Sequence, residues 1–563
     1  MGFWLLGNTS VRSALRIRDG LVAYSQSDIQ GKIRQQSGDI AFRRLLGERC
    51  IVSLGEDQSN SVGRKWRIAM GKLGFIFPEV PKKQGFSQDK LGPLDVITPA
   101  GWSLIRAETV AGIQECYLRA LTTPLTPVGS QTFSPLRWTL ALLLELERRQ
   151  EEASLSFLEI ALIVQTTTPI DGIDQVLAQI LDLRTRKNLA QTKRVFDRQE
   201  YEQGAQKLKC KADTLRDYAD MNIRYLKATG MLQAKGKGIA LAPEKRTLAL
   251  ALTQELVSDQ PLLELYRLLC NGAPLPTDQA ATARQVLDDL LLQSQRYDID
   301  YSLVDKPLDK PHQINQARYE LEELIAEKKE IEYAARQAEQ WREIAEYMDL
   351  IASKKTSKRL DEETEIRFSR LDAPVYLEWS IWRAFLAINT LANKPYEVRR
   401  FKIDQDFTPI SPAPGNGPDI IAEFENFVIV IEVTLSESSR QEAMEGEPVR
   451  RHIADLILQY DKPVYGLFLA NKIDSNTAET FRIGVWYTKE DERLDLRIVP
   501  LTLTQFSEFF KALFASKQVS PQALVALLME CERERQSCEA PKWKTVIAEI
   551  VKKHVENSAK AMF

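Results

Sequence analysis

The feature that most constrains the fold is a pair of β-rich runs, residues 419–424 and 427–434, which only two residues separate. The second run, FVIVIEVT, is almost entirely apolar, as is typical of a strand buried on both faces. A two-residue Glu-Asn loop between such runs predicts a β-hairpin. In the register that this loop imposes, Asp419 lies directly opposite Glu432 on one side of the sheet.

Two carboxylates at opposed positions of a hairpin define a candidate cation site. Their Cβ atoms are roughly 4.5–5.5 Å apart, and like charges at that spacing oppose folding unless a positive charge lies between them. Mg²⁺ is a hard cation that commonly takes one or two protein carboxylates together with phosphate oxygens of a substrate. Asp419 and Glu432 are therefore predicted metal ligands, and Thr434 points to the same side of the sheet.

Histidine and cysteine are too sparse for a zinc site. The chain has three histidines, far apart in the sequence, and six cysteines without a CxxC pair. We therefore expect idle, reduced thiols and a cytoplasmic protein. The first residues, MGFWLLGNTS, lack the apolar run of a signal peptide. No run approaches the roughly 18 apolar residues of a membrane span.

Charge is divided into opposed blocks along the 563 residues, whose net charge is −3. Residues 31–75 hold nine Lys or Arg against four Asp or Glu, and residues 181–250 hold 16 against eight. Residues 251–350 hold ten against 20, so this acidic block cancels most of the positive charge. Each basic block is a candidate surface for a polyanion such as DNA. The alternative is that basic side chains merely solvate helices.

Residues 214–241 combine a helix with a basic hairpin. The run TLRDYADMNIRYLKATGML has apolar residues at three- and four-residue steps, which predicts a helix. The following LQAKGKGIAL predicts a hairpin with two lysines at its tip. This order is typical of a winged helix, which places a helix in the DNA major groove and a wing on the backbone. The alternative is a winged helix that contacts protein. The candidate DNA-binding residues here are Arg216, Arg224, Lys235 and Lys237.

Two further segments suggest a second recognition module and a spacer. In GRKWRIAMGKLGFIFPEV, Arg64, Lys65 and Arg67 are interleaved with aromatic residues, which suits phosphate contact together with packing. Residues 313–352 predict one long helix with an apolar stripe and acidic other faces. Because an acidic helix does not lie on DNA, we expect it to be a spacer between modules.

The acidic pair also matches a nuclease pattern. PD, twelve residues and EVT together resemble the PD-(D/E)xK nuclease core, in which two acids bind metal and the lysine contacts the scissile phosphate. Thr434 stands at the lysine position. The longer segment GNGPDIIAEFENFVIVIEVT, followed by MEGEPVRRH, is similar to the catalytic domain of the AlwI-like restriction endonucleases. That family includes the BstNBI-type nicking endonucleases and related type IIS enzymes. The runs YLEWSIWRAFLAIN, LRIVPLTLTQF, DYADMNIRYLKATGML and KLGFIF agree, so the resemblance spans most of the chain.

The resemblance implies a site-specific endonuclease of the type IIS or nicking type. It implies Mg²⁺-dependent hydrolysis of a DNA phosphodiester, at a fixed distance from an asymmetric recognition sequence. Asp419 and Glu432 match the metal-binding pair of the family, and Glu445 and Glu378 match two further acids of the catalytic set. The family itself lacks the usual lysine at the position of Thr434, so that departure is expected within it. Because the sequence shows a single PD…E core, the default is one strand cut per monomer.

Arg450 and Arg451 follow Glu445 closely and are candidate contacts to the DNA backbone. The alternative is a helix face that packs toward solvent.

We therefore expect a multidomain α/β (α+β) protein. Its predicted parts are an N-terminal DNA-recognition domain (1–133), a winged-helix DNA-recognition domain (134–255), a helical linker (256–352) and a PD-(D/E)xK-like nuclease domain with a mixed sheet (353–563). The expected partners are double-stranded DNA, a companion DNA methyltransferase, and a small nuclease subunit or a transient homodimer for second-strand cleavage; no membrane partner is expected.

Two other functions stay open from the residues alone. One is a non-catalytic DNA-binding regulator with a relic nuclease domain, because the lysine is missing. The other is a phosphohydrolase for small substrates, although a small substrate needs no basic footprint of this extent.

Overall fold

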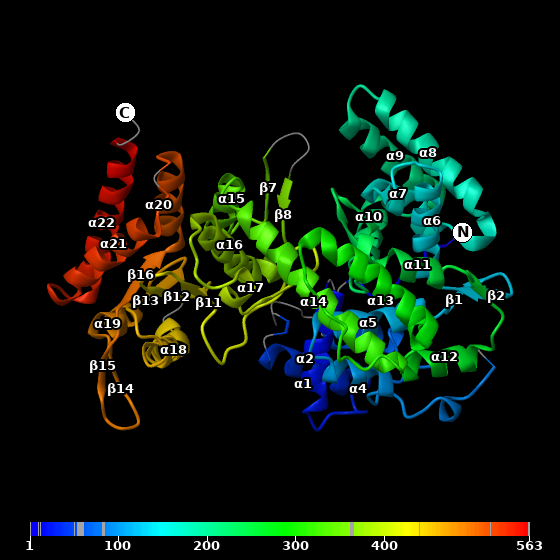
Figure 1. Ribbon diagram of the computed structural model, residues 1–563, viewed down its shortest axis with the longest axis horizontal. Coiled ribbons are helices and arrows are strands. Elements are labelled where there is room, and N and C mark those ends of the chain that lie inside the picture. The colour runs from blue at the N-terminus through cyan, green and yellow to red at the C-terminus, as the bar shows by residue number, and fades with distance from the viewer. Residues whose placement is uncertain are drawn as a thin grey trace. The chain divides into compact units, whose positions relative to one another are not determined.

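A computed structural model describes residues 2–9, 11, 13–49, 51–52, 61–80, 85–360, 365–437, 440–517 and 519–560. The chain divides into two compact units, Met1–Ala326 and Glu327–Phe563, whose elements are labelled in Figure 1. The boundary lies inside helix α14 (Pro311–Ala335), within the segment expected to be a linker. The finer four-part division stays a prediction.

The first unit is mainly helical and carries two small antiparallel sheets, β1-β2-β6 and β3-β5-β4. Its strands are β1 (Thr126–Val128), β2 (Gln131–Phe133), β3 (Ser154–Leu155), β4 (Leu232–Lys235), β5 (Gly238–Leu241) and β6 (Val257–Ser258). Its helices before α14 are α1 (Ile17–Ser25), α2 (Gln35–Glu48), α3 (Ser61–Lys72), α4 (Pro99–Arg106), α5 (Val110–Thr122), α6 (Pro135–Arg148), α7 (Phe157–Leu162), α8 (Ile173–Leu189), α9 (Lys193–Leu208), α10 (Ala212–Lys227), α11 (Arg246–Leu252), α12 (Leu262–Asn271) and α13 (Ala280–Ser294).

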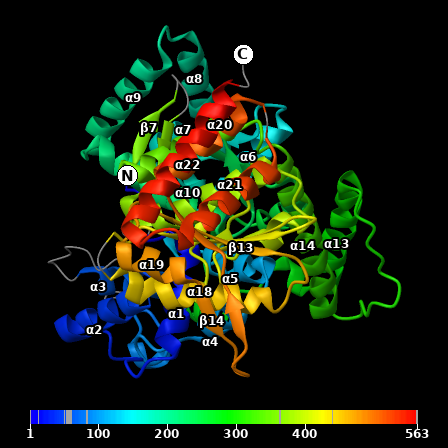
Figure 2. The same cartoon turned by 90° about the vertical axis from the view of Figure 1, so that its left-hand side faces the viewer.

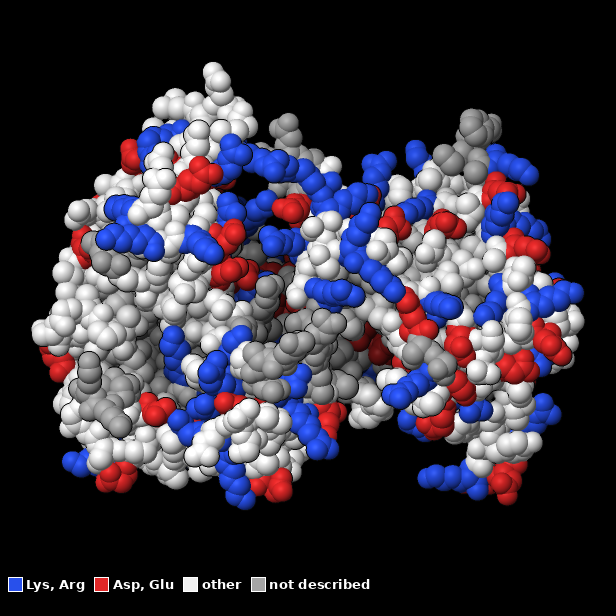
Figure 3. Space-filling model, turned by 180° about the vertical axis from the view of Figure 1, so that it is seen from behind, with Lys and Arg blue, Asp and Glu red and all other residues white. Residues whose placement is uncertain are grey.

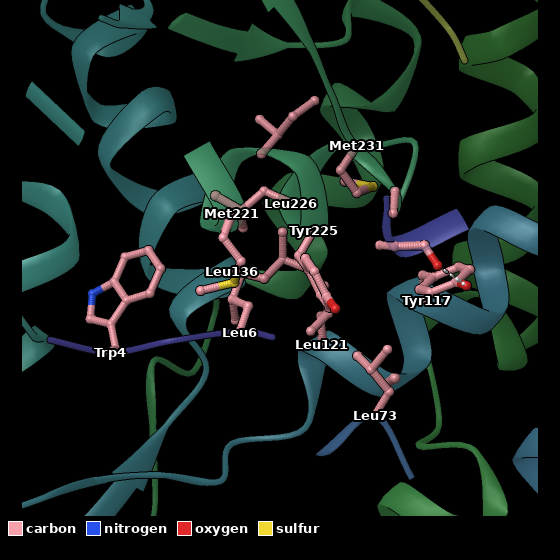
Figure 4. Packing of buried hydrophobic residues seen from close by; sticks show 14 of the residues in the cluster. Trp4, Leu6, Leu73, Tyr117, Leu121, Leu136, Met221, Tyr225, Leu226 and Met231 are labelled. Atoms are coloured by element: carbon pink, nitrogen blue, oxygen red, sulfur yellow. Dashed lines mark hydrogen bonds between the residues drawn. The ribbon is translucent and has the colours of Figure 1, made fainter. Parts of the chain in front are cut away.

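One hydrophobic core joins the two regions that the sequence predicts as separate recognition domains. Trp4 and Leu6, near the start of the chain, lie beside the α10 residues Met221 and Tyr225 in this core (Figure 4). The backbone N–H of Leu6 donates to the side-chain oxygen of the buried Asn222 at 3.0 Å, which fixes the segment against α10. Apolar burial of this extent stabilises the two regions together.

The predicted helix and basic hairpin at 214–241 are both present. Helix α10 is followed by strands β4 and β5, in which Lys235 pairs with Gly238. The tip is therefore a two-residue turn, and Gly236 takes a left-handed conformation there with φ of 57°.

The prediction of one long helix over 313–352 is wrong. Helix α14 ends at Ala335 and α15 (Trp341–Ala352) begins six residues later. The break has a physical reason within the second unit. The guanidinium of Arg383 is buried and needs hydrogen-bond acceptors, and side chains in and just after the break supply them. Its nitrogen atoms donate to side-chain oxygens of Gln337, Gln340 and Glu343 at 2.7–2.8 Å. Gln337 and Gln340 lie in the break and Glu343 lies in the first turn of α15, so this region supplies acceptors to a buried cation.

The second unit is built on a mixed four-stranded sheet in the order β11-β12-β13-β16. Strands β11 and β12 are antiparallel, whereas β12, β13 and β16 are parallel neighbours, which agrees with the mixed sheet expected for this region. The strands of the unit are β7 (Ser357–Arg359), β8 (Glu365–Arg367), β9 (Lys402–Ile403), β10 (Pro409–Ser411), β11 (Ile420–Glu423), β12 (Val428–Thr434), β13 (Val464–Ala470), β14 (Val485–Tyr487), β15 (Arg493–Asp495) and β16 (Ile498–Thr502). Its further helices are α16 (Ala373–Ile388), α17 (Pro395–Val398), α18 (Glu447–Ile457), α19 (Ser475–Ile483), α20 (Leu503–Ala515), α21 (Pro521–Arg533) and α22 (Ala540–Lys560).

Helices cover both faces of this sheet. Ile429 and Ile431 of β12 belong to the cluster formed with α16 and α20–α22, whereas Val428 and Val430 belong to the cluster formed with α18 and α19. Figure 2 shows α20–α22 on one side of β13 and α18 on the other. The alternation of side chains along a strand therefore places Glu432 on the α18 side.

The surface charges and the cysteines give little further indication of function. Lys and Arg are scattered over the face shown in Figure 3, with Asp and Glu among them. The five cysteines within the described residues are free thiols, and Cys50 lies outside those residues. Within the described residues, no helix is both long enough and apolar enough to cross a membrane.

Candidate active site

The hairpin β11–β12 has the register that the sequence predicts. Ile420 pairs with Ile431 and Glu423 pairs with Val428, so one step further Asp419 lies opposite Glu432. The carboxylate of Asp419 is held by the backbone of the opposite strand, since its Oδ2 accepts the N–H of Val433 at 2.8 Å.

Two further acids reach the same place from neighbouring elements. Glu378 lies on α16, and its Oε2 accepts the N–H of Ala413 at 2.8 Å. Glu445 lies in a π-helical turn, Glu442–Gly446, that leads into α18, and the hydroxyl of Thr434 acts to lower its pKa. Such π turns inside helices are frequent at functional sites. The structure thus brings together all four acids that the sequence singled out.

Burial raises the pKa of every carboxyl in the cluster, and repulsion by a neighbouring carboxylate adds to it for Asp419, Glu432 and Glu378. Burial, and then the charge of Glu432, raise the pKa of Asp419 from 3.8 to about 8. Burial, and then the charge of Glu445, raise the pKa of Glu432 from 4.5 to about 8. Burial and Asp419 raise the pKa of Glu378 well above its ordinary value, and burial raises that of Glu445. A set of buried oxygen donors that resists ionisation is short of positive charge.

The chemistry of this donor set fits a hard divalent cation. Carboxylate oxygens are the ligands that Mg²⁺ prefers, and two of them suffice when water and phosphate oxygens complete the shell. Among the described residues, no three or more Asp, Glu, His or Cys side chains are close enough to hold a metal ion by themselves. The fit is therefore to a site of one or two carboxylates, such as Asp419 and Glu432, rather than to a closed protein cage.

His452 is a site residue that the sequence did not place in the catalytic set. Its Nδ1 lies 2.7 Å from Oε1 of Glu432, and its buried Nε2 has no hydrogen-bond partner among the described residues. Burial, and then the charge of Arg451, lower the pKa of His452, so the ring is neutral at neutral pH. The signal in the sequence was its place seven residues after Glu445, which is two helical turns.

Some side chains of the first unit that are predicted to contact DNA are exposed, whereas others contact neighbouring residues of the same unit. Lys235 and Lys237 are exposed at the tip of the β4–β5 hairpin, and Arg64 is exposed on α3 with the half-buried Lys65 beside it. Arg67 is mostly buried, with its guanidinium 3.5 Å from the Asp39 carboxylate, which favours a structural role.

Two arginines on α10 make local contacts. The guanidinium of Arg216 lies over the ring of Tyr201 at 4.4 Å, and that of Arg224 lies 3.0 Å from the carboxylate of Asp220 on the same helix. An exposed ion pair such as that of Arg224 with Asp220 contributes about 0–1 kcal/mol.

Arg450 and Arg451 of α18 are also engaged locally. Nε of Arg450 donates to the carbonyl of Gly446 at 3.0 Å, and Nε of Arg451 lies 3.1 Å from a carboxylate oxygen of Glu447.

A comparison with protein families decides the class of this site. The family model described as AlwI restriction endonuclease matches residues 71–509, which contain all four acids together with α10 and the β4–β5 hairpin. The chain belongs to the AlwI restriction endonuclease family. It is therefore a restriction endonuclease, an enzyme that binds DNA and cuts it site-specifically.

Two solved structures are similar to this AlwI-family chain. One is the small subunit (R.BspD6I2) of the heterodimeric restriction endonuclease R.BspD6I, which is 26% identical, with 37% of this chain and 97% of that chain covered and a TM-score of 0.28. The other is the restriction endonuclease FokI, which is 11% identical, with 94% and 99% covered and a TM-score of 0.24. No curated protein matches in the corresponding sequence comparison.

Proposed function

We propose that this restriction endonuclease is of the type IIS or nicking type and hydrolyses DNA with Mg²⁺ at Asp419, Glu432, Glu445 and Glu378. One observation carries the proposal. Asp419 and Glu432 lie opposite each other in a fixed hairpin register, and the carboxylate of Asp419 accepts the N–H of Val433 on the facing strand. Two acids that repel each other at this distance are stable when they share a cation. The site supports a PD-(D/E)xK-type nuclease with threonine at the lysine position.

The chain's own side chains hold and orient the reacting groups. When bound, a divalent cation polarises the scissile phosphate and lowers the pKa of a bound water. Asp419 and Glu432 would hold that cation, and His452 fixes the orientation of Glu432 through the contact of 2.7 Å. Thr434 orients Glu445, which completes the outer shell together with Glu378.

Recognition of an asymmetric DNA sequence is proposed for the first unit. Helix α10 followed by a hairpin with two exposed lysines supports a winged helix that places α10 in the major groove and Lys235 and Lys237 on the backbone. Arg64 and Lys65 on α3 would add phosphate contacts from a second module. Cleavage at a fixed offset would follow from the separation of the recognition unit from the nuclease unit along the chain.

The described residues contain one such acid cluster, which supports cleavage of one strand per copy. Cutting of the second strand would then need a transient second copy of this chain or a small nuclease subunit. A restriction enzyme of this kind would act beside a companion DNA methyltransferase that protects the host sequence.

The test is cleavage of supercoiled plasmid DNA by the purified chain, with Mg²⁺ and with EDTA. We expect cutting only with Mg²⁺, and run-off sequencing of the products gives the site, the offset and the strand. Glu432→Ala is expected to abolish cutting without loss of DNA binding. Absence of cutting at every salt concentration, with DNA binding intact, would instead support the non-catalytic DNA-binding regulator.

A further inference from the structure

The position at which a PD-(D/E)xK nuclease carries its lysine has no cation in this chain. Thr434 stands there, and its hydroxyl is engaged with Glu445. Hydrolysis of a phosphodiester nevertheless builds negative charge on the phosphate oxygens, and a fixed cation next to those oxygens stabilises the transition state. This charge therefore has to come from another side chain that faces the acid pair.

The backbone places Arg400 directly beside the acid pair. Arg399 forms an antiparallel bridge with Ile420, and the N–H of Arg400 donates to the carbonyl of Asp419 at 3.3 Å. The next step of this register sets Arg400 opposite Asp419. Opposed residues of an antiparallel pair point to the same side of a sheet, so Arg400 is on the side that Asp419 shares with Glu432.

The loop before Asp419 holds the guanidinium of Arg400 in one place. Nη2 donates to Oδ1 of Asn416 at 3.0 Å, and Nη1 donates to the carbonyl of Pro418 at 3.4 Å. Gly417 makes this possible, because a Cβ atom at that residue would collide with Nη1 of Arg400. The sequence around PGNGPD thus provides a seat for an arginine as well as the start of the hairpin.

The charge of Arg400 is available to a substrate. Its hydrogen-bond acceptors are an amide and a carbonyl, and no carboxylate lies within ion-pair distance of it among the described residues. Neighbouring Arg399 differs, because its Nε and Nη2 donate to the carboxylate of Glu330 at 2.7–2.8 Å. Arg400 also opposes the rise in the pKa of Glu432 that burial causes, so its field reaches the acid pair.

We propose that Arg400 is a catalytic residue that contacts the scissile phosphate and supplies the positive charge that the motif's lysine supplies elsewhere. The inference rests on the proposed nuclease function. In the reaction, the oxygen of a water molecule forms a bond to phosphorus while the bond from phosphorus to the leaving sugar oxygen breaks. The water gives up one proton, and the leaving oxygen gains one. Arg400 stays protonated throughout, since arginine does not lose its proton in proteins, and its guanidinium matches two phosphate oxygens in geometry.

Three variants of the full chain test this role. Arg400→Ala removes the charge and Arg400→Lys keeps a cation without the planar fork. Arg482→Ala is the matched control, because Arg482 of α19 also lies in the second unit and its guanidinium is engaged with Glu479. The measurements are the single-turnover cleavage rate on a plasmid that the wild type cuts, the Kd for the same DNA in EDTA, and thermal unfolding.

We expect Arg400→Ala to lose about 10²- to 10³-fold in the cleavage rate, as when one donor to a developing oxyanion is removed. Its DNA affinity should stay within about threefold of wild type, since one phosphate contact among many is lost. Arg400→Lys should fall between wild type and Arg400→Ala, and Arg482→Ala should stay within about threefold of wild type. Guanidinium ion added to Arg400→Ala should restore part of the rate, whereas equal ionic strength from NaCl should not.

The outcomes separate this inference from the proposed function. Failure of the wild type to cut overturns the nuclease proposal itself. A wild type that cuts, with Arg400→Ala within about threefold of it, overturns the role of Arg400 alone. If Arg400→Ala has a lower cleavage rate together with a lower unfolding temperature, and guanidinium does not restore the rate, Arg400 is a structural residue. That result also overturns the inference.

Discussion

Nδ1 of His452 lies 2.7 Å from Oε1 of Glu432, and both side chains are buried. A carboxylate that binds metal is usually oriented by a hydrogen bond from a neighbour, and loss of that neighbour costs about 10- to 100-fold in metal affinity or activity. The pair joins α18 to β12, so the helix that follows Glu445 is tied to the strand that carries the predicted metal ligand.

His452→Ala is expected to lower the cleavage rate by about 10- to 100-fold. The concentration of Mg²⁺ that gives half-maximal rate should rise as well, because an unsupported Glu432 holds a cation less well. His554→Ala is the matched control, since Nε2 of His554 lies 2.9 Å from Glu530 in a histidine–glutamate pair of α22 and α21. A cleavage rate in His452→Ala within twofold of that control would contradict the role.

Stability of the metal-free protein should fall as the pH rises toward 8. The pKa values of Asp419 and Glu432 are about 8 in the folded chain, against ordinary values of 3.8 and 4.5. Between these limits the folded state binds more protons than the unfolded state, so this contribution is fully present below about pH 4 and is lost as the pH passes 8. Thermal unfolding in EDTA at pH 6 and at pH 8.5 measures it.

Mg²⁺ should restore stability at pH 8.5 because it compensates the ionised pair, and it should add less at pH 6. The double variant Asp419→Asn, Glu432→Gln carries no charge at these positions, so its unfolding temperature should depend less on pH and should not respond to Mg²⁺. A wild-type unfolding temperature that is higher at pH 8.5 than at pH 6 in EDTA would contradict the raised pKa values.

Thr434 should matter through its hydroxyl. Thr434→Val keeps the shape of the side chain and removes the hydroxyl that acts to lower the pKa of Glu445. A hydrogen bond to a charged group contributes about 1.5–3 kcal/mol, so the single-turnover cleavage rate is expected to fall about tenfold or more. Thr434→Ser keeps the hydroxyl and should cut at close to the wild-type rate. Equal rates for the two variants would show that Glu445 needs no support from this residue.

Arg383 should control the stability of the second unit. Arg383→Met leaves three acceptors, two in the break between α14 and α15 and one in the first turn of α15, without their donor. We expect a loss of about 2–3 kcal/mol in the free energy of unfolding, less than for fully buried acceptors because Glu343 is partly exposed. The control is Arg342→Met, which removes an exposed arginine next to the same break. Chemical denaturation of both variants measures the difference.

Local patterns predicted the parts of this structure that depend on neighbours in sequence. The register of the hairpin follows from a two-residue loop, so the opposition of Asp419 and Glu432 could be worked out from residue numbers alone. The break after Ala335 could not be predicted in this way, because Arg383, which contacts the break, lies far along the chain. The positions of His452 and Arg400 beside the acid pair could not be predicted for the same reason. Each reaches the acid pair through a helix or a bridge whose position against β11 and β12 is decided by packing.

The number of strands cut per copy can be measured from the order of the reaction. If one acid cluster cuts one strand, supercoiled plasmid should first become open circles, at a rate proportional to the enzyme concentration. Linear DNA from a transient pair of copies should then appear at a rate that rises with the square of that concentration. If a small nuclease subunit supplies the second cut, the chain alone should stop at open circles at every concentration. Linear DNA that forms in proportion to the enzyme, without open circles before it, would contradict cleavage of one strand per copy.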